Sequence, residues 1–171
     1  FNGTVAAWRP FQLAFILLNL DSVFQSIDDP NWEKRNELVD LVWFPTGGGK
    51  TESYLGIIAL VTINRRMSYE GNGGNGVAAI MRYTLRLLTT QQFQRAMRLI
   101  LALEQIRKWG IYNLGEEEIS IGLFVGESSL PNHYKCLAEE VRKNWTDDGS
   151  HGQIPLYKCP WCGSTLRSKE V

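Results

Sequence analysis

A run of three glycines followed by lysine and threonine is the segment of this sequence best suited to chemistry. Residues 44–51 read Phe-Pro-Thr-Gly-Gly-Gly-Lys-Thr. Glycines lack a Cβ atom, so their backbone N–H groups can approach an anion closely. Lys50 would reach the terminal phosphates of a nucleotide and the Thr51 hydroxyl would ligate Mg²⁺, which makes these two the predicted catalytic residues. The predicted phosphate cradle consists of Thr46, Gly47, Gly48, Gly49, Lys50 and Thr51.

The segments on either side of the cradle would have to position it. Residues 38–44 form an apolar run typical of a buried strand, and residues 51–67 have helical spacing. The order of strand, glycine loop and helix favours a phosphate site over a glycine-rich surface turn with a solvated lysine. Apolar runs at residues 77–81 and 119–125 predict two more strands. Further helices are expected over residues 85–109 and 134–145. This alternation predicts an α/β fold with a mostly parallel sheet and the cradle at the carboxyl end of its first strand.

Composition limits the classes of protein that this chain could represent. Its 171 residues suit about one domain, and a hydrophobic content of 44% supports a packed core. The formal net charge is zero, so any contact with nucleic acid must come from a local basic face. The longest apolar run is much shorter than the roughly 20 residues that span a membrane, and no secretion signal is recognisable. We therefore expect a cytoplasmic protein without membrane association.

Two of the three cysteines are spaced to share a metal ion. Cys159 and Cys162 lie in the sequence Cys-Pro-Trp-Cys-Gly, and two thiolates at this spacing can bind one tetrahedral Zn²⁺. We expect residues 151–171 to be the first half of a zinc-ribbon-like insertion that follows an ATP-binding lobe at residues 1–150. The other candidate ligands, Cys136, His133 and His151, do not fit the spacing of a standard zinc finger. Two unliganded surface cysteines are the alternative.

Three segments together resemble one group of proteins. They are residues 8–12 (Trp-Arg-Pro-Phe-Gln), residues 43–52 around the cradle, and residues 81–95 (Met-Arg-Tyr-Thr-Leu-Arg-Leu-Leu-Thr-Thr-Gln-Gln-Phe-Gln-Arg). The cradle lacks the first glycine of the strict pattern, as in motif I of superfamily 2 helicases and translocases. The full combination is similar to the large helicase-like subunit of the DISARM anti-phage defence system.

This resemblance implies a RecA-like P-loop motor lobe that binds ATP and Mg²⁺ and works as an ATP hydrolase on DNA. It implies that Gln12 reads the adenine edge with help from Arg9, whereas the residues alone equally allow Gln12 to be a polar position on an amphipathic helix. Residues 82–108 carry six basic side chains and one acidic one. Charge alone favours a solvated helix for this stretch. The resemblance instead implies that Arg82, Thr84 and Arg86 hold a nucleic-acid backbone.

Three further expectations complete the hypothesis. The sequence begins at Phe1 and contains no Asp-Glu pair at the end of a later apolar run, so we expect a fragment of a longer protein that is inactive alone. Other subunits of a defence system are expected as partners, by resemblance. Two alternatives remain open: a P-loop ATPase or kinase that does not act on nucleic acid, and a non-catalytic nucleic-acid-binding module that keeps nucleotide as a structural ligand.

Overall fold

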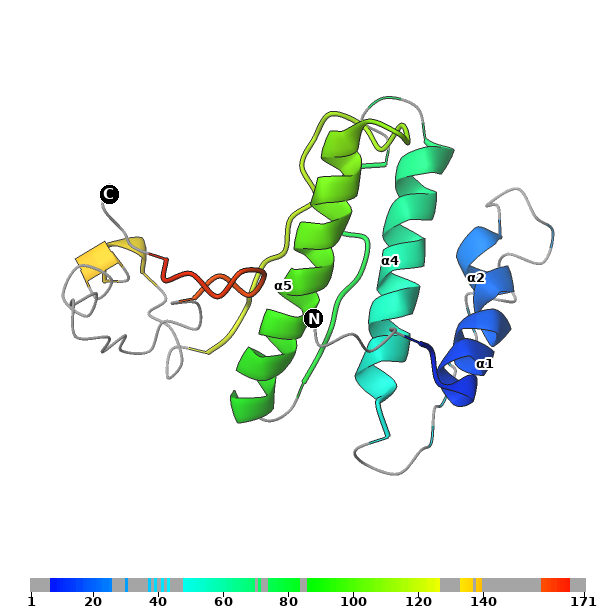
Figure 1. Cartoon of the computed structure of the whole chain (residues 1–171), viewed down its shortest axis with the longest axis horizontal. Helices are drawn as coiled ribbons and strands as arrows, with labels where there is room; N and C mark the ends of the chain where they lie inside the picture. The colour runs from blue at the N-terminus through cyan, green and yellow to red at the C-terminus, as the bar shows by residue number, and fades with distance from the viewer. Residues whose placement is uncertain are drawn as a thin grey trace. The chain divides into compact units, whose positions relative to one another are not determined.

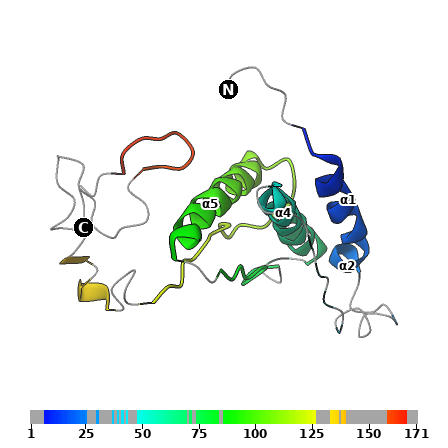
Figure 2. The same cartoon turned by 90° about the horizontal axis from the view of Figure 1, so that it is seen from below.

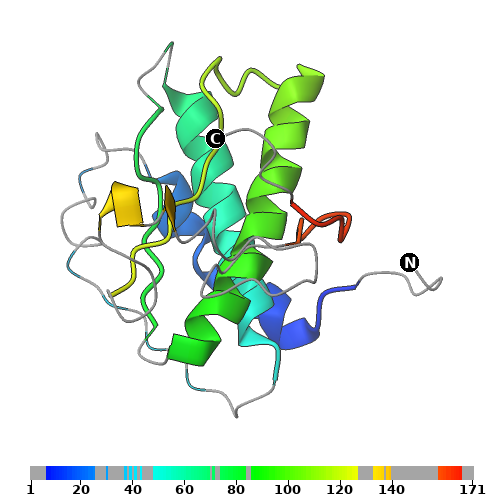
Figure 3. The ribbon, with the colours of Figure 1, turned by 90° about the vertical axis from the view of Figure 1, so that its left-hand side faces the viewer.

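The computed structural model describes most of the helical part of the chain. The described residues are 7–25, 30, 37, 39, 41, 43, 48–69, 71, 74–83, 86–126, 133–136, 138–139 and 158–166. Four helices have defined bounds: α1 (Pro10–Leu18), α2 (Leu20–Phe24), α4 (Lys50–Ser68) and α5 (Arg86–Trp109). Residues 134–136 and 138–139 are also helical (Figure 3, yellow). None of the described helices combines the length and apolar character that crossing a membrane requires.

The helices begin and end where local sequence signals place them. Pro10 opens α1, where its fixed φ and missing N–H cost nothing. The predicted helices at residues 51–67 and 85–109 are confirmed as α4 and α5, and no boundary differs from the prediction by more than one residue. Gly110 follows α5 with a φ of 68°, and its N–H donates to the carbonyl of Arg107 at 3.1 Å. This left-handed glycine ends the helix, as its position in the sequence predicts.

The chain divides into two compact units. One comprises residues 1–81 and 106–118, and the other comprises residues 82–105 and 119–171. The first unit holds the cradle, and the second holds most of α5 and the cysteine turn at residues 158–166.

In the first unit, α1 and α2 pack along α4 (Figures 1 and 2). Small residues of α4 allow this approach, because a Cβ atom added at Gly56 would lie 2.9 Å from Cδ1 of Ile16. The rings of Phe15 and Tyr54 meet edge to face, with centroids 5.9 Å apart. Asn64 on α4 donates from Nδ2 to the carbonyl of Val23 in α2 at 2.9 Å. The two short helices are therefore fixed to α4 by apolar contact and by a side-chain hydrogen bond.

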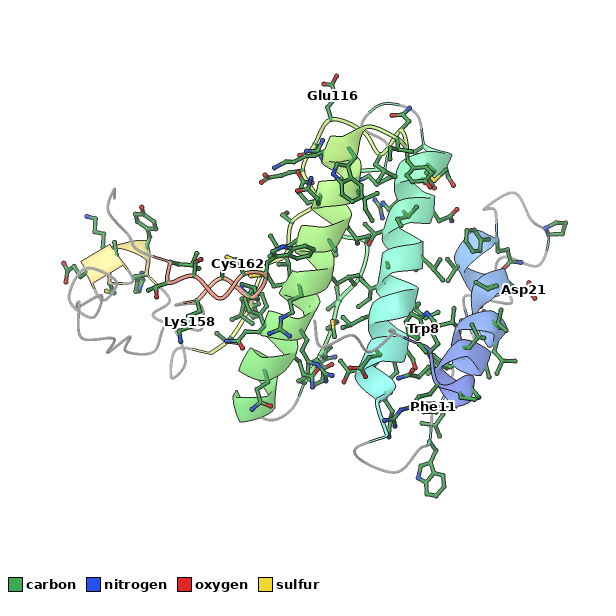
Figure 4. The ribbon with its side chains drawn as sticks, in the orientation of Figure 1. Trp8, Phe11, Asp21, Glu116, Lys158 and Cys162 are labelled. Atoms are coloured by element: carbon green, nitrogen blue, oxygen red, sulfur yellow. The ribbon has the colours of Figure 1, made fainter. Side chains whose placement is uncertain are left out.

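Two neighbouring arginines near the end of α4 hold two different loops. Arg65 donates from its guanidinium to the carbonyls of Gly74, Asn75 and Val77, at 3.1, 2.7 and 3.2 Å. Arg66 donates to the carbonyls of three residues in the loop that carries Glu116 (Figure 4), namely Leu114, Glu117 and Glu118. Each planar guanidinium thus satisfies several main-chain acceptors that no secondary structure pairs.

The prediction of an α/β fold with a mostly parallel, RecA-like sheet is wrong for the part of the chain that the structure describes. None of the described residues belongs to a strand, and an isolated antiparallel bridge joins Lys158 to Thr165. Val39, Leu41 and Trp43 lie in a predicted strand, yet their side chains are 93%, 91% and 86% exposed. The predicted strands at residues 77–81 and 119–125 likewise have no regular secondary structure.

The reason for this error is physical. A strand is held by hydrogen bonds to its neighbours and by burial of at least one face. An apolar run predicts that a segment favours burial, but it does not specify which surface covers it. In the third predicted strand Ile119 is buried but Phe124 is fully exposed, and no strand among the described residues pairs with this segment. The buried apolar side chains of the described residues are instead Ile16 and Leu114 in the first unit, and Ala96, Leu103 and Ile119 in the second.

Candidate nucleotide-binding site

The candidate site is the end of the glycine cradle and the first turn of α4. Gly49 is the residue before the helix and has φ 89° and ψ 32°, a left-handed conformation that glycine adopts without strain. Having no side chain, Gly49 cannot cap the helix, and α4 has no side-chain cap at its N-terminus. The first N–H groups of a helix have no acceptor within it, so they can donate to an anion. Lys50 and Thr51 are half-buried in this turn. Thr46 and Gly47 lie outside the described residues.

Gln12 and Arg9 lie directly against this turn. Gln12 donates from Nε2 to the carbonyl of Gly49 at 2.7 Å, and Arg9 donates from its guanidinium to the carbonyl of Gly48 at 3.0 Å. The other end of the Gln12 amide, Oε1, accepts from the backbone N–H of Arg9 at 2.9 Å. The start of α1 and the cradle, 37 residues apart in sequence, are therefore joined by the two side chains predicted to contact the base of one nucleotide.

The side of α4 that faces α1 carries unusually small residues. A Cβ atom added at Gly49 would lie 2.9 Å from Nε2 of Gln12, and one added at Gly56 would lie 3.1 Å from Cη2 of Trp8. Trp8 lies near the start of α1 (Figure 4). Ser53 lies between these two glycines in sequence, and its side chain is buried with no hydrogen-bond partner for Oγ in the described part of the chain. This close packing fixes the distance between Gln12 and the cradle.

Acidic and basic groups both contribute to the electrostatics of the turn. Lys50 places an ammonium group at the positive end of the helix dipole, where an anion would be favoured. Glu52, in the same turn, places a carboxylate oxygen 3.4 Å from the position of a Cβ on Gly49. A bound triphosphate would need Mg²⁺ to offset this negative charge.

The predicted nucleic-acid contacts lie in the second unit. Arg82 is exposed in a segment without regular secondary structure, and Arg86 is the first residue of α5. Thr84 lies outside the described residues. The described backbone thus puts Arg82 just before a helix N-terminus, a position from which cations can meet phosphate.

The two zinc candidates, Cys159 and Cys162, lie on a tight turn of the second unit, and Cys162 is labelled in Figure 4. Cys162 is exposed and Cys159 is half-buried. Hydrogen bonds from the side chain and the backbone of Ser164 and from the side chain of Cys159 lower the pKa of the Cys162 thiol below its ordinary value. Among the described residues no group of three or more histidine, cysteine or acidic side chains is placed to hold a metal ion.

The sequence did not predict the hydrogen bonds of four side chains. Gln12 bonds Gly49, Arg65 and Arg66 bond two loops, and Arg98 bonds Pro160, in each case through main-chain oxygens. A carbonyl is present at every residue, so no side-chain pattern marks the acceptor. The small-residue spacing of Gly49, Ser53 and Gly56 was the one signal in the sequence for the close approach of α1.

Comparison with known proteins gives a specific relation. No protein-family model matches the chain. Over 167 residues the chain is 43% identical to the "DISARM protein DrmA" of Bacillus paralicheniformis, an alignment that covers 92% of the chain. The same alignment covers 14% of that relative, so the chain spans about one seventh of its length. The expected relation to a DISARM protein is confirmed, whereas membership of helicase superfamily 2 stays a prediction.

Proposed function

We propose that this sequence forms the ATP-binding part of an anti-phage defence protein of the DISARM type. In this proposal the cradle and the N-terminus of α4 bind the phosphates of Mg²⁺-ATP, and the full-length protein hydrolyses ATP to act on DNA. The observation that carries the proposal is the network in which Arg9 and Gln12 bond the carbonyls of Gly48 and Gly49 at the start of α4. The similarity to a DISARM protein supports the role in defence.

Each residue of the network has a defined task in this proposal. Lys50 neutralises charge on the terminal phosphates, and the Thr51 hydroxyl ligates Mg²⁺. The Arg9 and Gln12 side chains keep the carbonyls of the cradle turned away from the anion, which leaves its N–H groups to face the phosphates. For Gln12 to read adenine as well, its amide would have to release Gly49 or the Arg9 backbone.

The proposed DNA contact belongs to the start of α5 and the segment before it. Arg82, Thr84 and Arg86 would hold the phosphate backbone, a contact that carries no base specificity. The exposure of Arg82 supports this role, because a phosphate can reach its guanidinium. Other subunits of the same defence system are the proposed protein partners.

Nucleotide binding by Lys50→Ala tests the proposal most directly. The measurement is the affinity of the full-length protein for a fluorescent ATP analogue with Mg²⁺. Loss of a hydrogen bond to a charged group costs about 1.5–3 kcal/mol, so we expect the dissociation constant to rise by about 10- to 100-fold. Thr51→Val should make the remaining affinity nearly independent of Mg²⁺.

Lys135→Ala is the matched control, because Lys135 is an exposed lysine of the other unit. Equal nucleotide affinity in the Lys50 and Lys135 variants would remove the cradle from the proposal. Steady-state ATP hydrolysis by the full-length protein, with and without DNA, then tests the proposed action on DNA. A rate that DNA does not change would favour an ATPase that acts on another substrate.

A further inference from the structure

The segment 158–166 forms a closed turn that brings two cysteines together. The N–H of Gly163 donates to the carbonyl of Cys159 at 2.8 Å, and the N–H of Cys159 donates to the carbonyl of Ser164 at 2.8 Å. The bridge between Lys158 and Thr165 closes the base of the turn. Gly163 has a φ of 76°, so the chain reverses directly after Cys162 at a position that favours glycine.

The side chains of the two cysteines are neighbours on this turn. The Cys162 thiol forms a hydrogen bond with the Cys159 side chain, and its Sγ also lies 3.2 Å from Oγ of Ser164. Cys162 is exposed and Cys159 is half-buried, so a cation can reach both sulfur atoms from solvent. The turn therefore presents two soft ligands and one neighbouring hydroxyl.

The turn is anchored within its own unit by α5. Arg98 donates from Nε to the carbonyl of Pro160 at 2.8 Å, between the two cysteines in sequence. This bond restrains the part of the backbone that sets the spacing of the two thiols. A guanidinium at this place also offsets the negative charge that two thiolates would bring.

We propose that Cys159 and Cys162 bind one Zn²⁺ ion through both sulfur atoms. Two thiolates at this spacing on a glycine-closed turn match the ligands that Zn²⁺ prefers. No third cysteine, histidine or carboxylate of the described residues is grouped with them, so water or ligands outside the turn complete the tetrahedron. The site is distinct from the nucleotide cradle, which lies in the other unit.

A disulfide between the same cysteines is the competing chemistry. Redox-active Cys-X-X-Cys pairs gain their reactivity at the N-terminus of a helix, where the dipole stabilises the thiolate. Here the pair lies in a turn whose following residues, 163–166, are not helical. The structure therefore favours metal binding over redox exchange.

Titration with Co²⁺, followed by displacement with Zn²⁺, tests the site in the full 171-residue chain. The chain is first reduced and freed of metal with a chelator. We expect a thiolate-to-cobalt charge-transfer band with tetrahedral d–d bands, saturation at one Co²⁺ per chain, and loss of the bands when Zn²⁺ is added. The intensity should correspond to two thiolates.

Single substitutions identify the ligands. Cys159→Ser and Cys162→Ser should each remove the charge-transfer band, whereas Cys136→Ser, at another exposed cysteine, should leave it unchanged. Ser164→Ala should weaken binding by about tenfold, the lower end of the effect of removing a hydrogen-bond partner from a metal ligand. Circular dichroism of each variant checks that the helices remain formed.

Three results would overturn the proposal. They are no band in the reduced wild-type chain, loss of the band in Cys136→Ser, and a band that survives both substitutions in the turn. Formation of a stable disulfide between Cys159 and Cys162 in the presence of excess Zn²⁺ would also contradict it, because a bound metal protects its thiolates from oxidation.

Discussion

Replacement of Gln12 by leucine tests whether the contact between α1 and the cradle contributes to stability. Gln12 is 5% exposed and makes two side-chain hydrogen bonds, one to the carbonyl of Gly49 and one from the N–H of Arg9. Leucine has a similar volume but neither a donor nor an acceptor. The substitution therefore removes both bonds without opening a large cavity.

The expected magnitude follows from these contacts. Each hydrogen bond contributes about 0.5–1.5 kcal/mol, and the carbonyl and N–H left without partners add a cost of about 1–3 kcal/mol where water cannot reach them. Burial of an apolar side chain at the same place returns about 1.5–3 kcal/mol. We expect Gln12→Leu to lower the free energy of unfolding by about 1–2 kcal/mol. For a unit of this size that corresponds to a fall in melting temperature of about 4–8 °C per kcal/mol.

The assay is urea unfolding followed by circular dichroism, with thermal melting as a second measurement. Gln105→Leu is the control, because Gln105 is an exposed glutamine on α5 and its replacement should change stability by less than about 0.5 kcal/mol. Equal unfolding free energies for the two variants would refute the reasoning. That result would mean that the bond between Gln12 and Gly49 does not hold the cradle in solution.

Two further substitutions test the loops around α4. Gly74→Ala should destabilise the chain by about 1–3 kcal/mol in urea unfolding, because the new Cβ would lie 2.8 Å from the backbone oxygen of Arg65. Gly122→Ala is the control and should be neutral, because no atom lies within 4 Å of its new Cβ. Arg65→Lys should speed proteolytic cleavage within residues 71–77 by about tenfold. An ammonium group cannot bond three carbonyls at once, as the guanidinium does. A loss of about 1.4 kcal/mol in the local stability of the loop corresponds to a tenfold faster cleavage. Unchanged cleavage there, with cleavage elsewhere as internal reference, would contradict the role of the guanidinium.

The helices could be predicted from the sequence because the residues that start, space and end a helix lie close together in the chain. Pro10 at a first turn, the spacing of residues 85–109 and the glycine at position 110 each report on neighbours within a few residues. The face that a helix buries is a less local property. The apolar Leu18 of α1 is 76% exposed, whereas the polar Gln12 is buried. Gln12 is buried because it has hydrogen-bond partners, which a hydrophobic pattern does not reveal.

Strands could not be predicted in the same way because their stability depends on distant partners. Ile80, in the middle of an apolar run, is 80% exposed, and Val77 is 73% exposed. Their β-branched side chains indicate a preference for a pleated, covered surface, but no described segment supplies one. The predicted fold class was therefore wrong because the β propensity of a segment does not show that another strand pairs with it.

For the candidate site, the local backbone geometry could be predicted from the sequence, but the contacts with distant residues could not. The residue types around the cradle predicted a phosphate site, and the left-handed Gly49 and the helix that begins at Lys50 agree with the loop-to-helix geometry on which it depends. The sequence did not predict that Gln12 and Arg9 would bond the cradle's own carbonyls. That contact depends on how closely α1 approaches α4, which the small residues of α4 permit but do not require.

The two arginines at the end of α4 have a consequence for how this sequence can vary among relatives. Within the part of the chain that the structure describes, Arg65 and Arg66 donate to main-chain oxygens alone, so these bonds do not constrain the side chains of the loops. Residues such as Asn75 and Glu117 can be substituted without loss of these hydrogen bonds, because their main-chain carbonyls remain. The two guanidinium groups, by contrast, have no substitute among the natural amino acids. Relatives should thus differ most in the loops and least in the arginines that hold them.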